Sequence, residues 1–206
     1  MREYPLNTLG LAHQFLAAHL QPGNRCIDAT VGRGRDTLFL AQLVGATGQV
    51  IGLDIQPEAI DSARQLLESH GLPVETVYSP TAAPGVLPAA PRIQLYEDCH
   101  SHIARYAAPE SVDAIVFNFG WLPGGDHSRF STAKTSVPAV EAALTLLKPG
   151  GVMSLSLYHG RNNGTAERDA LLAFLATIDN RRYTVLQGTF LNRTGDIPVP
   201  VFLFRE

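Results

Sequence analysis

Few cysteines and no long hydrophobic segment occur in this sequence of 206 residues. The two cysteines, Cys26 and Cys99, form no Cys-x-x-Cys pair, so we expect reduced thiols rather than a disulfide framework. No apolar run approaches the roughly 18 residues that are needed to cross a bilayer. Residues 1–5 are not followed by the apolar core of a signal peptide. We therefore expect no membrane partner and a cytoplasmic location.

Several catalytic signatures are also missing. There is no Gly-x-Ser-x-Gly elbow, which disfavours hydrolase chemistry. The histidines and cysteines do not recur at the intervals of metal ligands, so no metal site is expected. The net charge of −3 provides no global field for nucleic acid, and the only lysines are Lys134 and Lys148. Any RNA-binding surface must therefore be a local patch built mainly from arginine.

The residues that are present describe an ordinary globular chain. Hydrophobic residues make up 45% and charged residues 17%, which is typical of a protein with a substantial core. No repeat or linker divides the sequence, so we expect a single domain over residues 1–206. Five prolines fall within residues 72–92, which we interpret as a loop insertion with a strand-like segment at 75–78.

Hydrophobic periodicity and turn residues predict alternating strands and helices. The expected strands lie at residues 25–29, 49–53, 93–97, 112–117, 152–158, 183–190 and 199–204. The expected helices lie at residues 8–20, 35–45, 57–71, 100–107, 138–147 and 165–178. This alternation predicts an α/β, Rossmann-like fold with a mainly parallel seven-stranded sheet and helices on both faces. The final hairpin requires one antiparallel strand, which a plain nicotinamide-binding domain lacks.

Residues 26–37 form a strand–loop–helix opening of the kind that binds nucleotide cofactors. Gly32 and Gly34 let the backbone turn tightly and let a ligand approach the main chain. Asp54 ends the next predicted strand about 20 residues further on, where an acid binds ribose hydroxyls. A Gly-x-Gly by itself fits an ordinary strand-to-helix turn equally well, so Asp54 is the residue that favours a cofactor.

The charges around this loop favour a cationic ligand. Asp28 and Asp36 flank the glycines, and Thr37 replaces the third glycine of the dinucleotide pattern. A pyrophosphate prefers bare amides without a nearby anion. S-adenosylmethionine (SAM), which becomes S-adenosylhomocysteine (SAH), carries an ammonium, a sulfonium and a ribose, and therefore fits better. Arg33 and Arg35 could offset the acids, so a nicotinamide-dependent oxidoreductase stays open as an alternative.

Polar residues follow each of the first four predicted strands in the parallel part of the sheet. Because the carboxyl ends of parallel strands meet at one edge, these residues are expected to share one site. The predicted cofactor-binding residues are Asp28, Thr30, Gly32, Arg33, Gly34, Asp36, Thr37, Asp54, Gln56, Asp98, Cys99, His100 and Asn118.

Residues 117–127 form a second candidate site at the end of the fourth predicted strand. Asn118, followed by aromatic residues and Pro123, resembles the Asn-Pro-Pro-Tyr stretch with which amino-methyltransferases hold an acceptor nitrogen. Asn118 would align the amine, and Asp126 and His127 could take its proton. A Gly/Pro turn with an Asx cap, or a histidine with a purely structural role, would explain the same residues.

Nearly the whole chain resembles the MnmM family of small bacterial methyltransferases, also described as rRNA methylases. The resemblance is carried by Gly32 and Gly34 with Asp36-Thr37, by residues 52–56, by Asn118 and by the Leu-Pro-Gly-Gly-Asp-His run at 122–127. Asp28-Ala29-Thr30, Gly120, Gly164 and Glu167 also match. The sequence departs from the family's usual residues at Arg33, Arg35, Cys99 and Arg161.

The resemblance implies methylation of the exocyclic amine of 5-aminomethyl-2-thiouridine at the tRNA wobble position. It also implies the Rossmann-like class I methyltransferase fold, SAM as cofactor and the tRNA anticodon region as partner. Methylation of rRNA or of a small-molecule amine by the same fold is the alternative, and the sequence leaves monomer and homodimer open. The candidate RNA-binding cations are Arg33, Arg35, Arg129, Lys134 and Arg161.

Overall fold

The computed structural model describes residues 5–78, 92–120, 131–158 and 164–206. The helices are α1 Thr8–His19, α2 Arg35–Val44, α3 Pro57–Ser69, the 3-10 helix η1 His100–Arg105, α4 Ala133–Leu146 and α5 Gly164–Leu175. The strands are β1 Arg25–Asp28, β2 Gln49–Asp54, β3 Glu75–Tyr78, β4 Ile93–Glu97, β5 Val112–Phe119, β6 Leu147–Leu157, β7 Tyr183–Gln187 and β8 Val199–Arg205.

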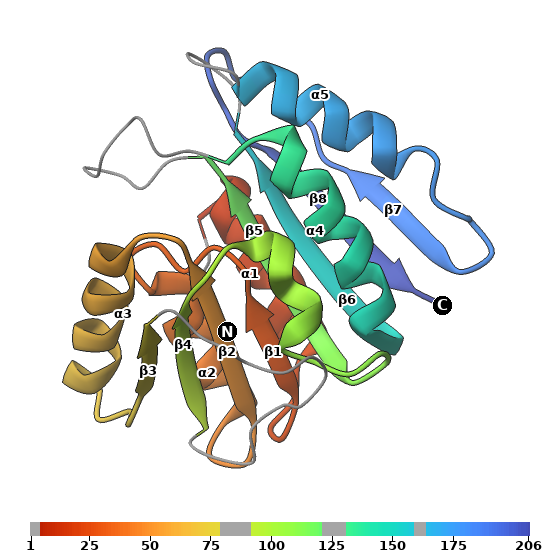
Figure 1. The fold of residues 1–206 in the computed structure, drawn as a ribbon. Coiled ribbons are helices and arrows are strands. Elements are labelled where there is room, and N and C mark those ends of the chain that lie inside the picture. Colours follow the sequence, from red (N-terminus) through yellow and green to blue (C-terminus); the bar gives the residue numbers. More distant parts are fainter. Residues whose placement is uncertain (1–4, 79–91, 121–130, 159–163) are drawn as a thin grey trace.

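The described strands form one eight-stranded sheet in the order β3-β4-β2-β1-β5-β6-β8-β7 (Figure 1). Every pair from β3 to β6 is parallel, whereas β8 runs antiparallel to both β6 and β7. The strand order reverses at β1, because β2 and β5 lie on its two sides. In such sheets a ligand binds at the carboxyl ends of the strands beside this reversal.

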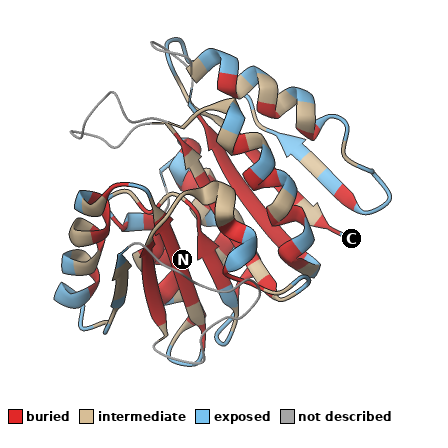
Figure 2. Cartoon of the chain, in the orientation of Figure 1, coloured by how far each residue is buried: buried red, intermediate tan, exposed pale blue. Residues whose placement is uncertain are grey.

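Alternating side chains of the central strands build two hydrophobic layers. Ile27 and Ile115 belong to the layer beneath η1, α4 and α5, whereas Cys26 and Ala114 belong to the layer beneath α1, α2 and α3. This two-residue period follows from strand geometry and requires helices on both faces. The centre of the sheet is accordingly buried, and the exposed positions lie on the outer sides of the helices, in the connecting loops and on the edge strand β7 (Figure 2).

The predicted fold is confirmed, and several of its elements differ from their predicted bounds. The sheet has eight strands rather than seven, because Glu75–Tyr78 pairs in parallel with β4 as an additional edge strand. The predicted helix at 138–147 is wrong at its start: α4 begins at Ala133, and Pro138 lies inside it. Proline is favoured in a first helical turn because its missing N–H needs no partner there, and this preference placed the start too late.

Residues 148–151, which precede the predicted strand at 152–158, belong to β6 in the structure. The pairing of β5 with β6 shifts register between Val112 and Ala114. In the described ranges, no helix combines the length and the hydrophobicity that a membrane-spanning segment needs.

Candidate active site

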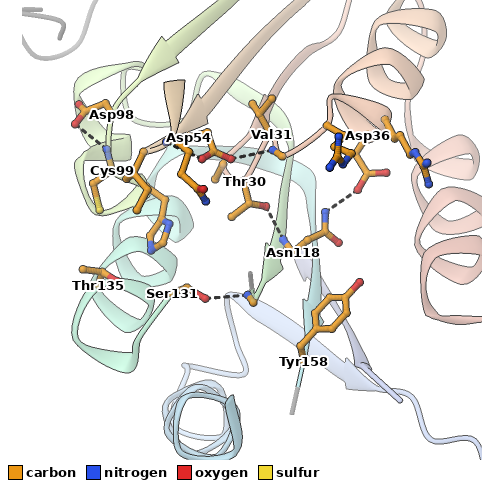
Figure 3. Close-up of a pocket in the computed structure, with 18 of the residues that line it drawn as sticks. Thr30, Val31, Asp36, Asp54, Asp98, Cys99, Asn118, Ser131, Thr135 and Tyr158 are labelled. Atoms are coloured by element: carbon orange, nitrogen blue, oxygen red, sulfur yellow. Dashed lines mark hydrogen bonds between the residues drawn. The ribbon is translucent and has the colours of Figure 1, made fainter. Parts of the chain in front are cut away.

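A cavity of about 490 Å³ opens at the carboxyl ends of the central strands (Figure 3). It lies at the reversal of strand order, where the sequence predicted the site. Ten of the predicted cofactor-binding residues line it: Thr30, Gly32, Arg33, Asp36, Asp54, Gln56, Asp98, Cys99, His100 and Asn118. Within the described ranges it is also lined by residues that the sequence analysis did not select, among them Leu9, Ser131, Thr132, Thr135 and Tyr158.

The glycine loop is fixed to the neighbouring strand by Asp54. One Asp54 oxygen accepts the backbone N–H of Gly32 at 2.9 Å, and the other accepts the N–H of Gln56 at 3.0 Å (Figure 3). Gly32 has a φ of +52°, a conformation that other residues rarely adopt. Burial raises the pKa of Asp54, while the backbone N–H donors oppose that shift. Asp54 thus presents a hydrogen-bonded carboxylate at the cavity wall, with lone pairs left for a ligand.

Asp28, Gly34 and Thr37 were predicted as cofactor-binding residues, but they are not among the residues that line the cavity. Asp28 is fully buried, and it accepts the Thr37 hydroxyl at 2.6 Å and the Thr30 N–H at 3.2 Å. Gly34 packs against α3, where an added Cβ would lie 2.7 Å from the Cα of Ala63. Asp28 and Thr37 lie beneath the loop, Gly34 belongs to it, and all three hold its shape.

Asp36 and Asn118 form a polar pair on the cavity wall. The Asn118 amide nitrogen donates to Asp36 at 2.6 Å, and the Asn118 backbone N–H donates to the Thr30 hydroxyl at 2.7 Å (Figure 3). Because Asp36 occupies the nitrogen side of the amide, the Asn118 side-chain oxygen is left as a hydrogen-bond acceptor for a ligand. The other Asp36 oxygen contacts His13 Nε2 at 2.7 Å. His13, which comes from α1, is not among the site residues predicted from the sequence.

Asp98 organises the cavity wall after β4. It accepts the Cys99 N–H, the His102 ring nitrogen and the Tyr106 hydroxyl, each at 2.7 Å. Burial alone would raise the pKa of Asp98, but these donors lower it below its ordinary value. Asp98 is therefore an ionised carboxylate that fixes the backbone around Cys99.

His100 lines the same wall as a neutral ring. Burial, assisted by the nearby His102, lowers its pKa to about 4. Phe117 and Phe119 pack edge-on against it at centroid distances of 6.4 and 5.6 Å. Its Nε2 is buried and has no hydrogen-bond partner among the described residues. Buried polar atoms are nearly always paired, so this nitrogen points to a ligand as its partner.

A buried carboxylate links α5 to the end of β5. Glu167 accepts the hydroxyls of Ser131, at 2.9 Å, and of Ser136. Ser131 also accepts the Gly120 N–H at 2.9 Å (Figure 3). Burial raises the pKa of Glu167, and the two serine donors oppose the shift. The network holds Gly120 and Ser131 together at the cavity edge, although ten residues separate them in the sequence.

Four residues of the predicted site fall outside the described ranges: Asp126, His127, Arg129 and Arg161. Their roles as proton acceptors or RNA-binding cations stay predictions. Of the other candidate cations, Arg33 and Arg35 line the cavity, and Lys134 is exposed in the first turn of α4 between two residues that line it. The described residues contain no cluster of three metal-ligating side chains.

Comparison with known proteins identifies the family. Residues 50–204 match the family described as "Putative rRNA methylase", and residues 20–78 match a general methyltransferase domain. The chain belongs to the rRNA methylase family. It is a SAM-dependent methyltransferase, which decides against a nicotinamide-dependent oxidoreductase.

Relatives of this rRNA methylase family member cover almost the entire chain. A chloroplastic tRNA (mnm5s2U34)-methyltransferase of Arabidopsis thaliana is 33% identical over 95% of the chain and 68% of its own length. An rRNA-methylase structure from Clostridium thermocellum, described as putative, is 31% identical over 99% of this chain and all of its own, with a TM-score of 0.87. A Streptococcus mutans methyltransferase, also described as putative and solved with SAH, is 28% identical over both full chains, with a TM-score of 0.80.

The residues of this family member fit its cofactor. The cavity has the volume of a small-molecule site and combines apolar walls with a few convergent polar groups. The carboxylates of Asp36 and Asp54 suit the positive charges and the ribose hydroxyls of SAM, and His100 Nε2, which has no partner among the described residues, offers a further polar contact.

Proposed function

We propose that this methyltransferase N-methylates the 5-aminomethyl group of uridine or 2-thiouridine at the tRNA wobble position. The observation that carries the proposal is the fixed orientation of Asn118. Its amide nitrogen is held by Asp36, so its side-chain oxygen is the acceptor available at the cavity wall. An acceptor oxygen binds an amine through its N–H. The Arabidopsis relative, a tRNA (mnm5s2U34)-methyltransferase, supports tRNA as the source of this amine.

The order of polar groups along the sheet edge supports one direction for the cofactor. Along this edge the strands follow one another in the order β4, β2, β1 and β5. Asp98 follows β4, Asp54 ends β2, and Asn118 lies near the end of β5. Asp54 would hold the ribose, as acids at this position do. Asp36 would hold the ammonium because it is the carboxylate nearest to Asn118. The base would then lie beside Cys99 and His100.

The residues of the site act mainly by orienting the amine. SAM supplies a methyl group that is activated by its positive sulfur. Asn118 would align the amine lone pair with that methyl group, and such positioning lowers barriers by up to roughly 7–11 kcal/mol in model systems. The amine must be neutral to react, and Asp126 and His127 are the predicted proton acceptors.

Because one sheet carries all these groups, we also propose that residues 1–206 form one methyltransferase domain.

Nucleoside mass analysis tests this proposal. Bulk tRNA that lacks the terminal methyl group is incubated with the protein and isotopically labelled SAM, then digested to nucleosides. We expect one labelled methyl on 5-aminomethyl-2-thiouridine, and Asn118→Ala should lose label much more strongly than it loses SAH affinity. Label in rRNA or in small amines, with none in tRNA, would replace the proposal by the alternative acceptors of the same fold.

A further inference from the structure

A chain of three polar side chains reaches from α1 to the cavity. His13 Nε2 lies 2.7 Å from one Asp36 oxygen, and the other Asp36 oxygen accepts the Asn118 amide nitrogen at 2.6 Å. Asp36 and Asn118 line the cavity, whereas His13 is not among its lining residues and reaches it through Asp36. The chain therefore joins α1, the first turn of α2 and the end of β5.

The His13 ring is held in one orientation. It stacks on Phe39 with a centroid distance of 3.8 Å and an interplanar angle of 10°. The helix that carries it is fixed at its start, where Asn7 caps the Gly10 N–H and the Thr8 hydroxyl donates to the Pro198 carbonyl. A stacked ring on an anchored helix has little freedom to turn. Its nitrogen therefore defines where the Asp36 carboxylate lies.

The orientation of Asn118 depends on that carboxylate. The two ends of an amide differ little in shape, so only the hydrogen-bond partners decide which end faces the cavity. With Asp36 fixed, the nitrogen faces the carboxylate and the oxygen is left for the ligand. If Asp36 moves, the amide can turn and present its N–H₂ group, which cannot accept the N–H of an amine.

We infer that His13 is a positioning residue for the acceptor amine, which acts by holding Asp36 so that the Asn118 oxygen faces the cavity. The inference rests on the proposed function, because it names the machinery that orients the amine. It assigns a role in methyl transfer to α1, a helix that precedes the cofactor loop in the chain. Hydrogen bonds to a carboxylate are stronger than neutral ones, so this linkage is suited to fixing one rotamer.

Three single variants separate positioning from general stability. His13→Leu removes the donor to Asp36, and His13→Gln keeps an N–H donor on an uncharged side chain. His19→Leu is the matched control, because His19 lies on the same helix and has ring contacts to Phe15 and Phe204, but its ring nitrogen contacts the Phe15 carbonyl and not Asp36. We expect His13→Leu to lower kcat about 10- to 100-fold, with KM for tRNA nearly unchanged. His13→Gln should recover much of the loss, and His19→Leu should retain the wild-type kcat.

A double-mutant cycle tests whether the effect passes through Asn118. In an Asn118→Ala background, His13→Leu should cause little further loss of kcat, because the group that it positions is already absent. Equal losses in both backgrounds would overturn the inference. An equal loss in His13→Leu and His13→Gln would also overturn it, since a donor would then not matter.

The side-chain amide signal of Asn118 in NMR spectra provides a readout that needs no activity. The signal is assigned by its disappearance in Asn118→Ala. We expect His13→Leu to shift it and to speed exchange of its protons, whereas His19→Leu leaves it in place. If tRNA is not methylated at all, the proposed function fails while this readout still decides the inference: an unmoved Asn118 signal in His13→Leu refutes it.

Discussion

Asp28 is a buried carboxylate whose ionisation opposes folding. Burial, reinforced by the charge of Asp36, raises its pKa from 3.8 to about 7. Between these values the folded chain binds a proton that the unfolded chain has released, so the free energy of unfolding falls as the pH rises through this window. Above a pH of about 7 both states are ionised and the contribution is constant. Asp28→Asn should remove this decline, because its amide stays neutral.

Denaturant unfolding of both proteins across this pH range measures the effect. The free energy of unfolding of the wild type should fall relative to that of Asp28→Asn as the pH rises, and the difference should level off near neutrality. Glu167 also has a raised pKa, but it is present in both proteins and cancels in the difference. Asp54 is present in both proteins too, and its charge is one of the causes of the raised pKa of Asp28. Parallel pH profiles for the two proteins would contradict the assignment to Asp28.

Asp54 combines a structural role with its predicted role at the ribose. Its two oxygens accept N–H groups from Gly32 and Gln56, so Asp54→Ala would release the loop as well as the ligand. Asp54→Asn disturbs the loop less, because it keeps the shape and one acceptor oxygen and loses only one of the two backbone hydrogen bonds. A hydrogen bond to a charged group contributes about 1.5–3 kcal/mol, so SAH affinity should fall roughly 10- to 100-fold. Calorimetry measures it, with Asp61→Asn on the exposed side of α3 as the control.

The glycine loop depends on its close approach to α3. Gly34 has a φ of +77°, and a Cβ there would lie 2.7 Å from both the Cα and the Cβ of Ala63. Gly150 has a nearly identical φ of +78° with no atom near its Cβ position, so Gly150→Ala reports the backbone strain alone. That strain costs about 1–2 kcal/mol. Gly34→Ala should cost a further 1–3 kcal/mol, roughly, because the loop must move away from α3.

Thermal or denaturant unfolding of the two glycine variants checks this difference. Gly34→Ala should also weaken SAH binding, because Gly32 and Asp36 move with the loop, whereas Gly150→Ala should bind SAH normally. Equal destabilisation in both variants would mean that backbone strain, and not the contact with Ala63, explains why glycine is required at position 34.

The helices and strands were largely predictable because their signals are local. The short apolar runs of β1, β2 and β5 and the Asn7 cap of α1 lie within short windows of sequence. The start of α4 was not predictable in this way. Pro138 offered a strong signal for a first turn, but tertiary packing extends the helix back to Ala133 and buries Ser136 against Glu167, which is 31 residues away in the chain.

The location of the site was predictable, but the direction of individual side chains was not. Parallel strands bring their carboxyl ends to one edge, so Asp36, Asp54, His100 and Asn118 meet at one cavity as expected. Sequence spacing could not separate residues that line the cavity from Asp28, which lies beneath it. Nor could it reveal His13, because that contact depends on how α1 packs beside α2.

Over the entire chain, the net charge of −3 provides no general attraction for the proposed tRNA substrate, so we expect a few local cations at the cavity edge to bind it. Arg35 lines the cavity and Lys134 lies between two residues that line it. If both contact phosphates, the dependence of log affinity on log salt should lose about one unit of slope per cation removed. The double variant Arg35→Gln, Lys134→Gln should therefore bind tRNA more weakly at low salt, with SAH affinity retained.

Arg181→Gln is the control for the double variant. This exposed arginine precedes β7, at the edge of the sheet opposite to the carboxyl ends of the parallel strands and the cavity. An unchanged salt slope in the double variant would remove both residues from the RNA-binding surface.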